Sequence, residues 1–263
     1  MTPSTPRLTA IGSGKGGTGK TFVAVSLAQA FADLGERVLL CDADLGLSNT
    51  LVQLGVMQSG DLPALLAGGC GLKEAVAGIR LGAHAPFDLL AAPPGTGLFS
   101  DADAQTAESL AALLKRATGY DRVLIDLGAG VGSTVMTLAA RSDDALVLAT
   151  PDPSAITDAY AFIKLFLKRT GGRTPSLAVN LAASAAEAKR AAESLIQSAR
   201  TFLHAAPVYL GFVPGDARVV EAVRRQSVLC TLYPQSPAAQ AIALLAVALG
   251  GQTGKQKIAN NLR

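Results

Sequence analysis

Short apolar runs alternate along the chain with longer segments whose apolar positions recur every three or four residues. A short continuous apolar run is typical of a strand buried on both faces, and the longer repeat is typical of an amphipathic helix. The predicted strands are residues 7–13, 37–41, 87–91, 122–127, 145–150, 176–180 and 208–213. The predicted helices are residues 22–34, 61–67, 102–117, 132–141, 154–169, 185–204, 217–226 and 237–249. This alternation predicts an α/β fold, a doubly wound and mostly parallel sheet with helices on both faces.

The composition supports one domain with a large core. The chain has 263 residues, of which 49% are hydrophobic and 16% are charged. Neither an internal repeat nor a linker divides it, and one α/β domain is the natural number for this length. We therefore expect a single domain over residues 1–250 and a polar, mobile tail over residues 251–263.

A glycine-rich segment joins the first predicted strand to the first predicted helix. Residues 13–21 match the P-loop pattern G-x-x-x-x-G-K-[ST]. In this setting backbone N–H groups and the helix N-terminus surround the phosphates of a nucleoside triphosphate. We expect Lys20 to reach the β- and γ-phosphates and Thr21 to hold Mg²⁺ through its hydroxyl. The predicted nucleotide-binding residues of this segment are Gly14, Lys15, Gly16, Gly17, Thr18, Gly19, Lys20, Thr21 and Phe22.

A second lysine lies inside the P-loop. Lys15 follows Gly14 directly, so two ammonium groups lie close together unless phosphate neutralises both. Its side chain could project across a subunit interface onto the nucleotide of a partner. The alternative is an ordinary solvated surface lysine.

Acidic residues follow two of the predicted strands. Ligands of such sheets lie at the carboxyl ends of the strands, where the second strand leads into Asp42 and Asp44. We expect Asp42 to support the Mg²⁺ shell through water, and Asp44 to orient or deprotonate the attacking water. Alternatively, both carboxylates only cap a loop. Asp126 ends a run of apolar residues in a Walker B pattern and is predicted to lie beside the metal.

Later strands offer candidates for the base pocket. Asn180 ends the sixth predicted strand, and its amide presents both a donor and an acceptor to the edge of an adenine. Pro214 and Asp216 follow the last strand and are predicted to form the other wall. Ordinary turn chemistry is the alternative for all three residues.

The charge, the cysteines and the hydropathy limit the class of protein to which this chain can belong. The formal net charge is only +3, which does not by itself argue for binding of nucleic acid or membrane. The cysteines, Cys41, Cys70 and Cys230, are far apart and fit no metal-ligand spacing, which predicts reduced cytosolic thiols. We find no signal peptide and no apolar run near the ~20 residues that span a bilayer. We expect a soluble cytoplasmic protein.

Taken together, these motifs resemble the MinD/ParA family of dimerising ATPases with a deviant Walker A motif. The resemblance covers nearly the whole chain and is greatest to the flagellar-number branch of FlhG and FleN. The segments that carry it are residues 13–21, 42–49, 125–130, 150–160, 222–226 and 233–241. The segment 150–160, Thr-Pro-Asp-Pro-Ser-Ala-Ile-Thr-Asp-Ala-Tyr, is among the most specific of these.

The resemblance implies an ATP-dependent switch. ATP and Mg²⁺ would be the cofactors, and Lys15 would reach the phosphates of the second subunit in a homodimer. Lys15, Lys20 and Asp44 would act in a slow, partner-stimulated hydrolysis, and Asp126 would belong to the switch. The implied role is control of the number or placement of flagella. A signal-recognition-type GTPase or a flagellar switch or regulator protein would be the partner, at the cell pole or the inner face of the membrane.

Some features depart from the family pattern. Flagellar-number members often carry an N-terminal extension that stimulates the GTPase, and we do not expect residues 1–6 to do so. In the tail, Ile258 and Leu262 bury little area, so we expect membrane contact to be weak or transient. The main alternative function is a ParA-like partition or positioning ATPase acting on DNA or another polar cargo. We do not expect DNA binding, because Glu221 interrupts the nearby arginines.

Overall fold

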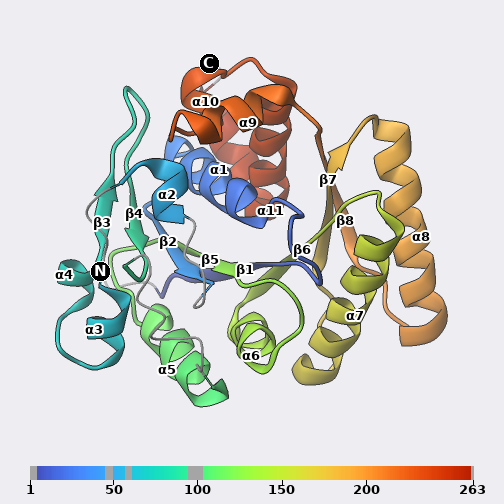
Figure 1. Ribbon diagram of the computed structural model, residues 1–263, viewed down its shortest axis with the longest axis horizontal. Helices are drawn as coiled ribbons and strands as arrows, with labels where there is room; N and C mark the ends of the chain where they lie inside the picture. The colour runs from blue at the N-terminus through green and yellow to red at the C-terminus, as the bar shows by residue number, and fades with distance from the viewer. Residues whose placement is uncertain (1–4, 45–49, 57–60, 94–102, 262–263) are drawn as a thin grey trace.

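The structure is a computed structural model that describes residues 5–44, 50–56, 61–93 and 103–261, with side chains up to residue 250. Its strands form an eight-stranded sheet in the order β3-β4-β2-β5-β1-β6-β7-β8 (Figure 1). They are β1 (Arg7–Gly12), β2 (Val38–Ala43), β3 (Ala77–Ile79), β4 (Phe87–Leu90), β5 (Arg122–Leu127), β6 (Asp144–Ala149), β7 (Ser176–Ala182) and β8 (Val208–Pro214). The pairs are parallel except β3–β4, so the predicted fold class is confirmed.

Helices cover both faces of the sheet. In Figure 1, α1 and α11 lie on one side together with α9 and α10, and α5, α6, α7 and α8 lie on the other. The helices are α1 (Lys20–Asp33), α2 (Thr50–Leu54), α3 (Leu62–Leu66), α4 (Leu72–Ala75), α5 (Ala104–Lys115), α6 (Ser133–Arg141), α7 (Pro153–Thr170), α8 (Ala185–Leu203), α9 (Ala217–Arg224), α10 (Leu229–Leu232) and α11 (Pro237–Asn261). Among the described residues, none of the helices is long and apolar enough to cross a membrane.

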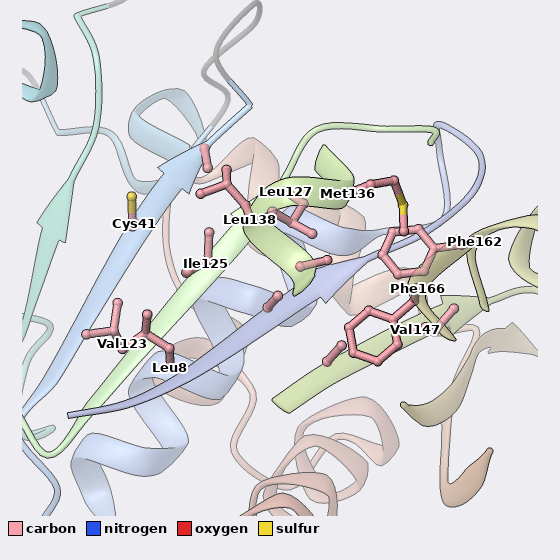
Figure 2. Close-up of a cluster of buried hydrophobic side chains, with 14 of the residues drawn as sticks. Leu8, Cys41, Val123, Ile125, Leu127, Met136, Leu138, Val147, Phe162 and Phe166 are labelled. Carbon is pink, nitrogen blue, oxygen red and sulfur yellow. The ribbon is translucent and has the colours of Figure 1, made fainter. Parts of the chain in front are cut away.

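The core forms one layer on each side of the sheet. Successive residues of a central strand point to opposite faces, so Val123 packs toward α5–α8 and Leu124 packs toward α1 and α11. Figure 2 shows the first layer, in which Phe162 and Phe166 of α7 pack beside Val147. Because both faces are covered, the central strands are apolar almost throughout, and polar side chains concentrate at the strand ends.

Parallel pairing brings the carboxyl ends of the central strands together. β1 lies between β5 and β6, and β2 lies next to β5. Asp42 at the end of β2 is directly opposite Asp126 at the end of β5. The segment after β1 therefore begins beside two carboxylates.

Several element boundaries differ from those predicted. The helix predicted to end at residue 249 continues to Asn261, so the backbone of most of the predicted tail is helical. The antiparallel strand β3 and the short helices α2, α4 and α10 were not predicted, because three to five residues are too few to establish a periodicity. Residue 102, the first of the helix predicted over 102–117, and the segment 45–49 lie outside the described residues.

Candidate nucleotide-binding site

The P-loop connects the end of β1 to the start of α1. The helix begins at Lys20, directly after Gly19, whose φ of +83° is a left-handed conformation that suits glycine. The Ser13 hydroxyl donates a hydrogen bond of 2.6 Å to the carbonyl of Lys15 and closes the loop on itself. The loop therefore presents a helix N-terminus at the carboxyl edge of the sheet, which favours an anion.

Lys20 is buried at the base of this loop. Its ammonium donates a hydrogen bond of 3.1 Å to the Ser13 hydroxyl. Burial lowers the pKa of Lys20, and the nearby carboxylates of Asp126 and Asp44 oppose this shift. An anionic phosphate at this position would stabilise the buried ammonium further.

The three predicted acids lie next to one another, although they come from different strands. The carboxylate of Asp42 accepts hydrogen bonds from the backbone N–H groups of Asp44 (3.1 Å) and Thr50 (3.2 Å). This is the loop-capping chemistry considered as the alternative, and it also fixes the position of Asp44. A Cβ placed on Gly128 would lie 3.4 Å from Oδ1 of Asp44, so the loop after β5 runs beside this carboxylate.

Asp126 is a buried and strongly perturbed acid. It is 1% exposed, and its Oδ1 has no hydrogen-bond partner among the described residues. Burial, followed by the charge of Asp42, raises the pKa of Asp126 to about 7, and a hydrogen bond from Thr21 opposes the shift. Carboxylate and hydroxyl oxygens are the ligands that Mg²⁺ prefers, and an unsatisfied buried oxygen fits a missing cation. The residues present therefore fit a magnesium site beside the P-loop.

Asn180 lies directly under the P-loop. Its side-chain amide donates a hydrogen bond of 2.8 Å to the carbonyl of Thr18, and a Cβ on Gly19 would lie 2.3 Å from the amide nitrogen. The structure thus gives Asn180 the task of holding the loop against β7, and recognition of a base stays a prediction. Pro214 ends β8 beside Ala182. Asp216 caps α9 by accepting from the N–H of Arg218 at 3.0 Å, which is turn chemistry.

Lys15 points toward the N-terminus of α7. Its ammonium lies 3.3 Å from the carboxylate of Asp152 and contacts the hydroxyl of Ser154. Asp152 is the N-cap residue of α7, and its hydrogen bonds from Ser154, followed by the contact with Lys15, lower its pKa. Both charged side chains are about half exposed. In the single chain, Lys15 is therefore neither free nor directed at its own phosphate site.

Sequence reasoning named most of these residues and missed some. Ser13, Asp152 and Ser154 were not predicted to take part, although an Asp followed by Pro at the start of a helix is a recognisable cap. Phe22 is buried in the core between α1 and the sheet, so any contact with nucleotide falls to its backbone.

Comparison with known proteins agrees with this geometry. A family model described as the CobQ/CobB/MinD/ParA nucleotide binding domain matches residues 9–229. The antiactivator FleN of Pseudomonas aeruginosa is 34% identical over 237 residues, which are 90% of this chain and 84% of that protein. The flagellum site-determining protein YlxH of Helicobacter pylori is 31% identical and is matched over 89% of this chain and 78% of its own length.

A solved structure extends the similarity to the fold. The septum site-determining protein MinD of Pyrococcus horikoshii, complexed with Mg-ADP, superposes with a TM-score of 0.77 at 26% identity. The match covers 96% of this chain and 98% of that one. Together with the P-loop and the acids beside it, these matches establish that the chain belongs to the MinD/ParA family of P-loop ATPases.

Proposed function

We propose that this protein is an ATP-dependent, dimerising ATPase that acts as a switch controlling the number or placement of flagella. The observation that carries the proposal is the buried Lys20 close to Asp44 and Asp126, with Asp42 directly opposite Asp126, in a chain 34% identical to FleN. Of the relatives compared above, YlxH is named as a flagellum site-determining protein, and FleN belongs to the flagellar-number branch that the motifs of this chain resemble; both match about nine-tenths of this chain.

In this proposal each residue at the edge has one task. Lys20 binds the β- and γ-phosphates, and the backbone N–H groups of the loop surround them. Thr21 and Asp126 hold Mg²⁺, with Asp42 acting through water. Bound Mg²⁺ supplies charge neutralisation at the phosphates. Asp44 orients the attacking water, and its position is supported by the hydrogen bond between its N–H and Asp42.

Dimerisation is assigned to Lys15. To reach a phosphate of the partner subunit, its ammonium must leave Asp152 and Ser154. Because Lys15 and Asp152 are about half exposed, their interaction is screened by water and is easily exchanged for a phosphate. Closing of the dimer then frees the N-terminus of α7, which we propose as part of the surface presented to a partner. That partner would be a signal-recognition-type GTPase or a flagellar switch or regulator protein.

Hydrolysis by purified protein tests the catalytic part. We expect Mg²⁺-dependent release of phosphate from ATP, at a low rate in the absence of a partner. Both Lys20→Ala and Asp44→Ala should abolish it, whereas Lys189→Ala, at a solvent-exposed position on α8, should not change it. Equal rates of phosphate release in the wild-type protein and the three variants would contradict the assigned site.

Counting flagella by electron microscopy tests the cellular part. Cells that lack the gene should show an altered number or position of flagella, and the wild-type gene should restore them, whereas Lys20→Ala should not. Unchanged flagella would exclude the flagellar role without affecting the catalytic assignment. Salt-dependent binding of non-specific DNA by the ATP-bound protein would instead support a partition or positioning ATPase.

A further inference from the structure

Three metal-binding side chains meet at the end of α1 remote from the P-loop. Asp33 is the last residue of α1, His84 lies between β3 and β4, and Cys230 lies in α10. Each of these residues offers one ligand atom, and the three atoms lie within 4.8 Å of one another. They are a carboxylate oxygen, an imidazole nitrogen and the cysteine sulfur. The helix α1 has 14 residues and is about 21 Å long, so this cluster is separate from the nucleotide site.

We propose that Asp33, His84 and Cys230 form a binding site for Zn²⁺. Zinc accepts thiolate, imidazole and carboxylate ligands together, whereas Mg²⁺ and Ca²⁺ require oxygen ligands. Tetrahedral zinc places its nitrogen and sulfur ligands roughly 3.5 Å apart. The most widely spaced pair of ligand atoms therefore needs to close by about 1 Å, whereas Oδ2 of Asp33 and Nδ1 of His84, which are 2.9 Å apart, need to separate slightly. Water would complete the fourth position.

The carboxylate of Asp33 is already oriented for this role. Its Oδ1 accepts hydrogen bonds from the N–H of Ala85 and from the amide of Gln29, both at 3.0 Å. Gln29 is fully buried and also donates to the carbonyl of Ala85 at 2.8 Å. The other oxygen, Oδ2, is turned toward Nδ1 of His84 at 2.9 Å. Hydrogen bonds of this kind hold metal ligands in place and tune their affinity.

A metal ion can reach the cluster from solvent. Asp33 and Cys230 line a groove of about 580 Å³ between α1 and α11. The side chains of His84 and Asp33 are 27% and 35% exposed. The ligands are thus partly buried, as a stable site requires, and still accessible.

Binding would join segments that are distant in the sequence. Zinc would link three elements: the end of α1, the connection between β3 and β4, and the short helix α10. Burial and the charge of Asp33 raise the pKa of the Cys230 thiol to about 11. The metal-free protein therefore holds a protonated thiol at neutral pH, and binding releases that proton to solvent as the sulfur–zinc bond forms.

Titration of the chelator-treated full-length protein with Co²⁺ and Zn²⁺ tests the proposal. Co²⁺ should produce the charge-transfer absorption of a thiolate ligand at one ion per chain, and Zn²⁺ should displace it. Cys230→Ser should remove this absorption and lower the affinity for Zn²⁺ by roughly 100-fold or more. His84→Gln and Asp33→Asn should lower the affinity in the same direction.

Cys70→Ser is the matched control, because Cys70 is also a partly buried free thiol but lies outside the cluster. It should retain both the absorption and the affinity. Absence of the thiolate absorption in the wild-type protein, or its retention in Cys230→Ser, would overturn the proposal. The spectrum of the wild-type protein tests the proposed zinc site even if a variant fails to fold. Binding of ATP should be unchanged in every folded variant, so failure here is distinct from failure of the proposed ATPase function.

Discussion

At the scale of single residues, the nucleotide site contains a destabilising charge. Asp126 is buried beside Asp42, and its raised pKa means that the folded protein holds its ionised form unfavourably. We expect Asp126→Asn to increase the free energy of unfolding of the metal-free protein above pH 7 by up to about 4 kcal/mol. The same change should weaken Mg²⁺-dependent ATP binding. Urea unfolding measures the change in the free energy of unfolding, and calorimetry measures the change in ATP affinity.

The pH dependence provides the control for this prediction. An acid whose pKa rises from 3.8 to about 7 on folding destabilises the protein fully above pH 7. The destabilisation decreases as the pH falls from 7 toward 4, because the folded protein takes up the proton first. The gain from Asp126→Asn should therefore shrink over this range. A gain that is the same at pH 5 and pH 8 would show that charge is not its cause.

Gly19 combines a left-handed backbone with a close neighbour. Its φ of +83° nearly equals the +81° of Gly35, but a Cβ on Gly19 would meet Asn180 at 2.3 Å, whereas one on Gly35 would meet nothing within 4 Å. Alanine at either position should cost about 1–2 kcal/mol of backbone strain. Only Gly19→Ala should also displace Asn180 from Thr18 and abolish ATP binding. Equal ATP affinities in the two variants, measured by calorimetry, would refute this role of the Asn180 contact.

At the scale of elements, the P-loop and α7 are packed in direct contact. A Cβ on Gly14 would lie 2.0 Å from the carbonyl oxygen of Asp158 in α7, whereas the nearest atom to one on Gly16 would be 3.9 Å away. Gly14→Ala should displace α7 and lower the free energy of unfolding by about 1–3 kcal/mol. Gly16→Ala should change it by no more than about 0.5 kcal/mol. Urea unfolding of both proteins compares them, and equal stabilities would contradict the contact.

Much of the fold could be predicted because the pattern is strong in the central elements. The apolar residues of β5 indicated a buried strand, and the periodicity over residues 102–117 indicated a helix; β5 is buried throughout, and α5 runs over Ala104–Lys115. The edge strand β3 could not be predicted, since three residues paired to one neighbour carry no periodicity. The helix α11 runs past Gly250 even though glycine weakens helices.

The part of the candidate site that consists of local motifs was predicted, and the contacts between residues distant in the sequence were not. The P-loop and the acids after β2 and β5 are local motifs at strand ends, and parallel pairing alone brings them together. The contact of Lys15 with Asp152 joins residues 137 positions apart, which no local pattern shows. The same holds for Cys230, whose isolated position in the sequence gave no sign of Asp33 and His84 beside it.

At the scale of the whole molecule, the account requires two subunits. We expect Lys15→Ala to bind ATP with nearly wild-type affinity, because Lys20 and not Lys15 lies in the base of its own P-loop. The variant should nevertheless remain a monomer with ATP and Mg²⁺ in analytical ultracentrifugation. Lys164→Ala, on the surface of α7, is the matched control and should dimerise normally. Dimerisation of Lys15→Ala would remove Lys15 from the interface.

The most direct measurement is the mass of Asp44→Ala by light scattering with ATP and Mg²⁺. Because Asp44 is assigned to placing the attacking water, this variant should bind ATP without hydrolysing it and accumulate the closed state. We expect twice the mass of the 26.7 kDa chain with ATP, and the mass of a single chain with ADP. A protein that binds ATP yet keeps the mass of a single chain would contradict the proposed ATP-driven dimer.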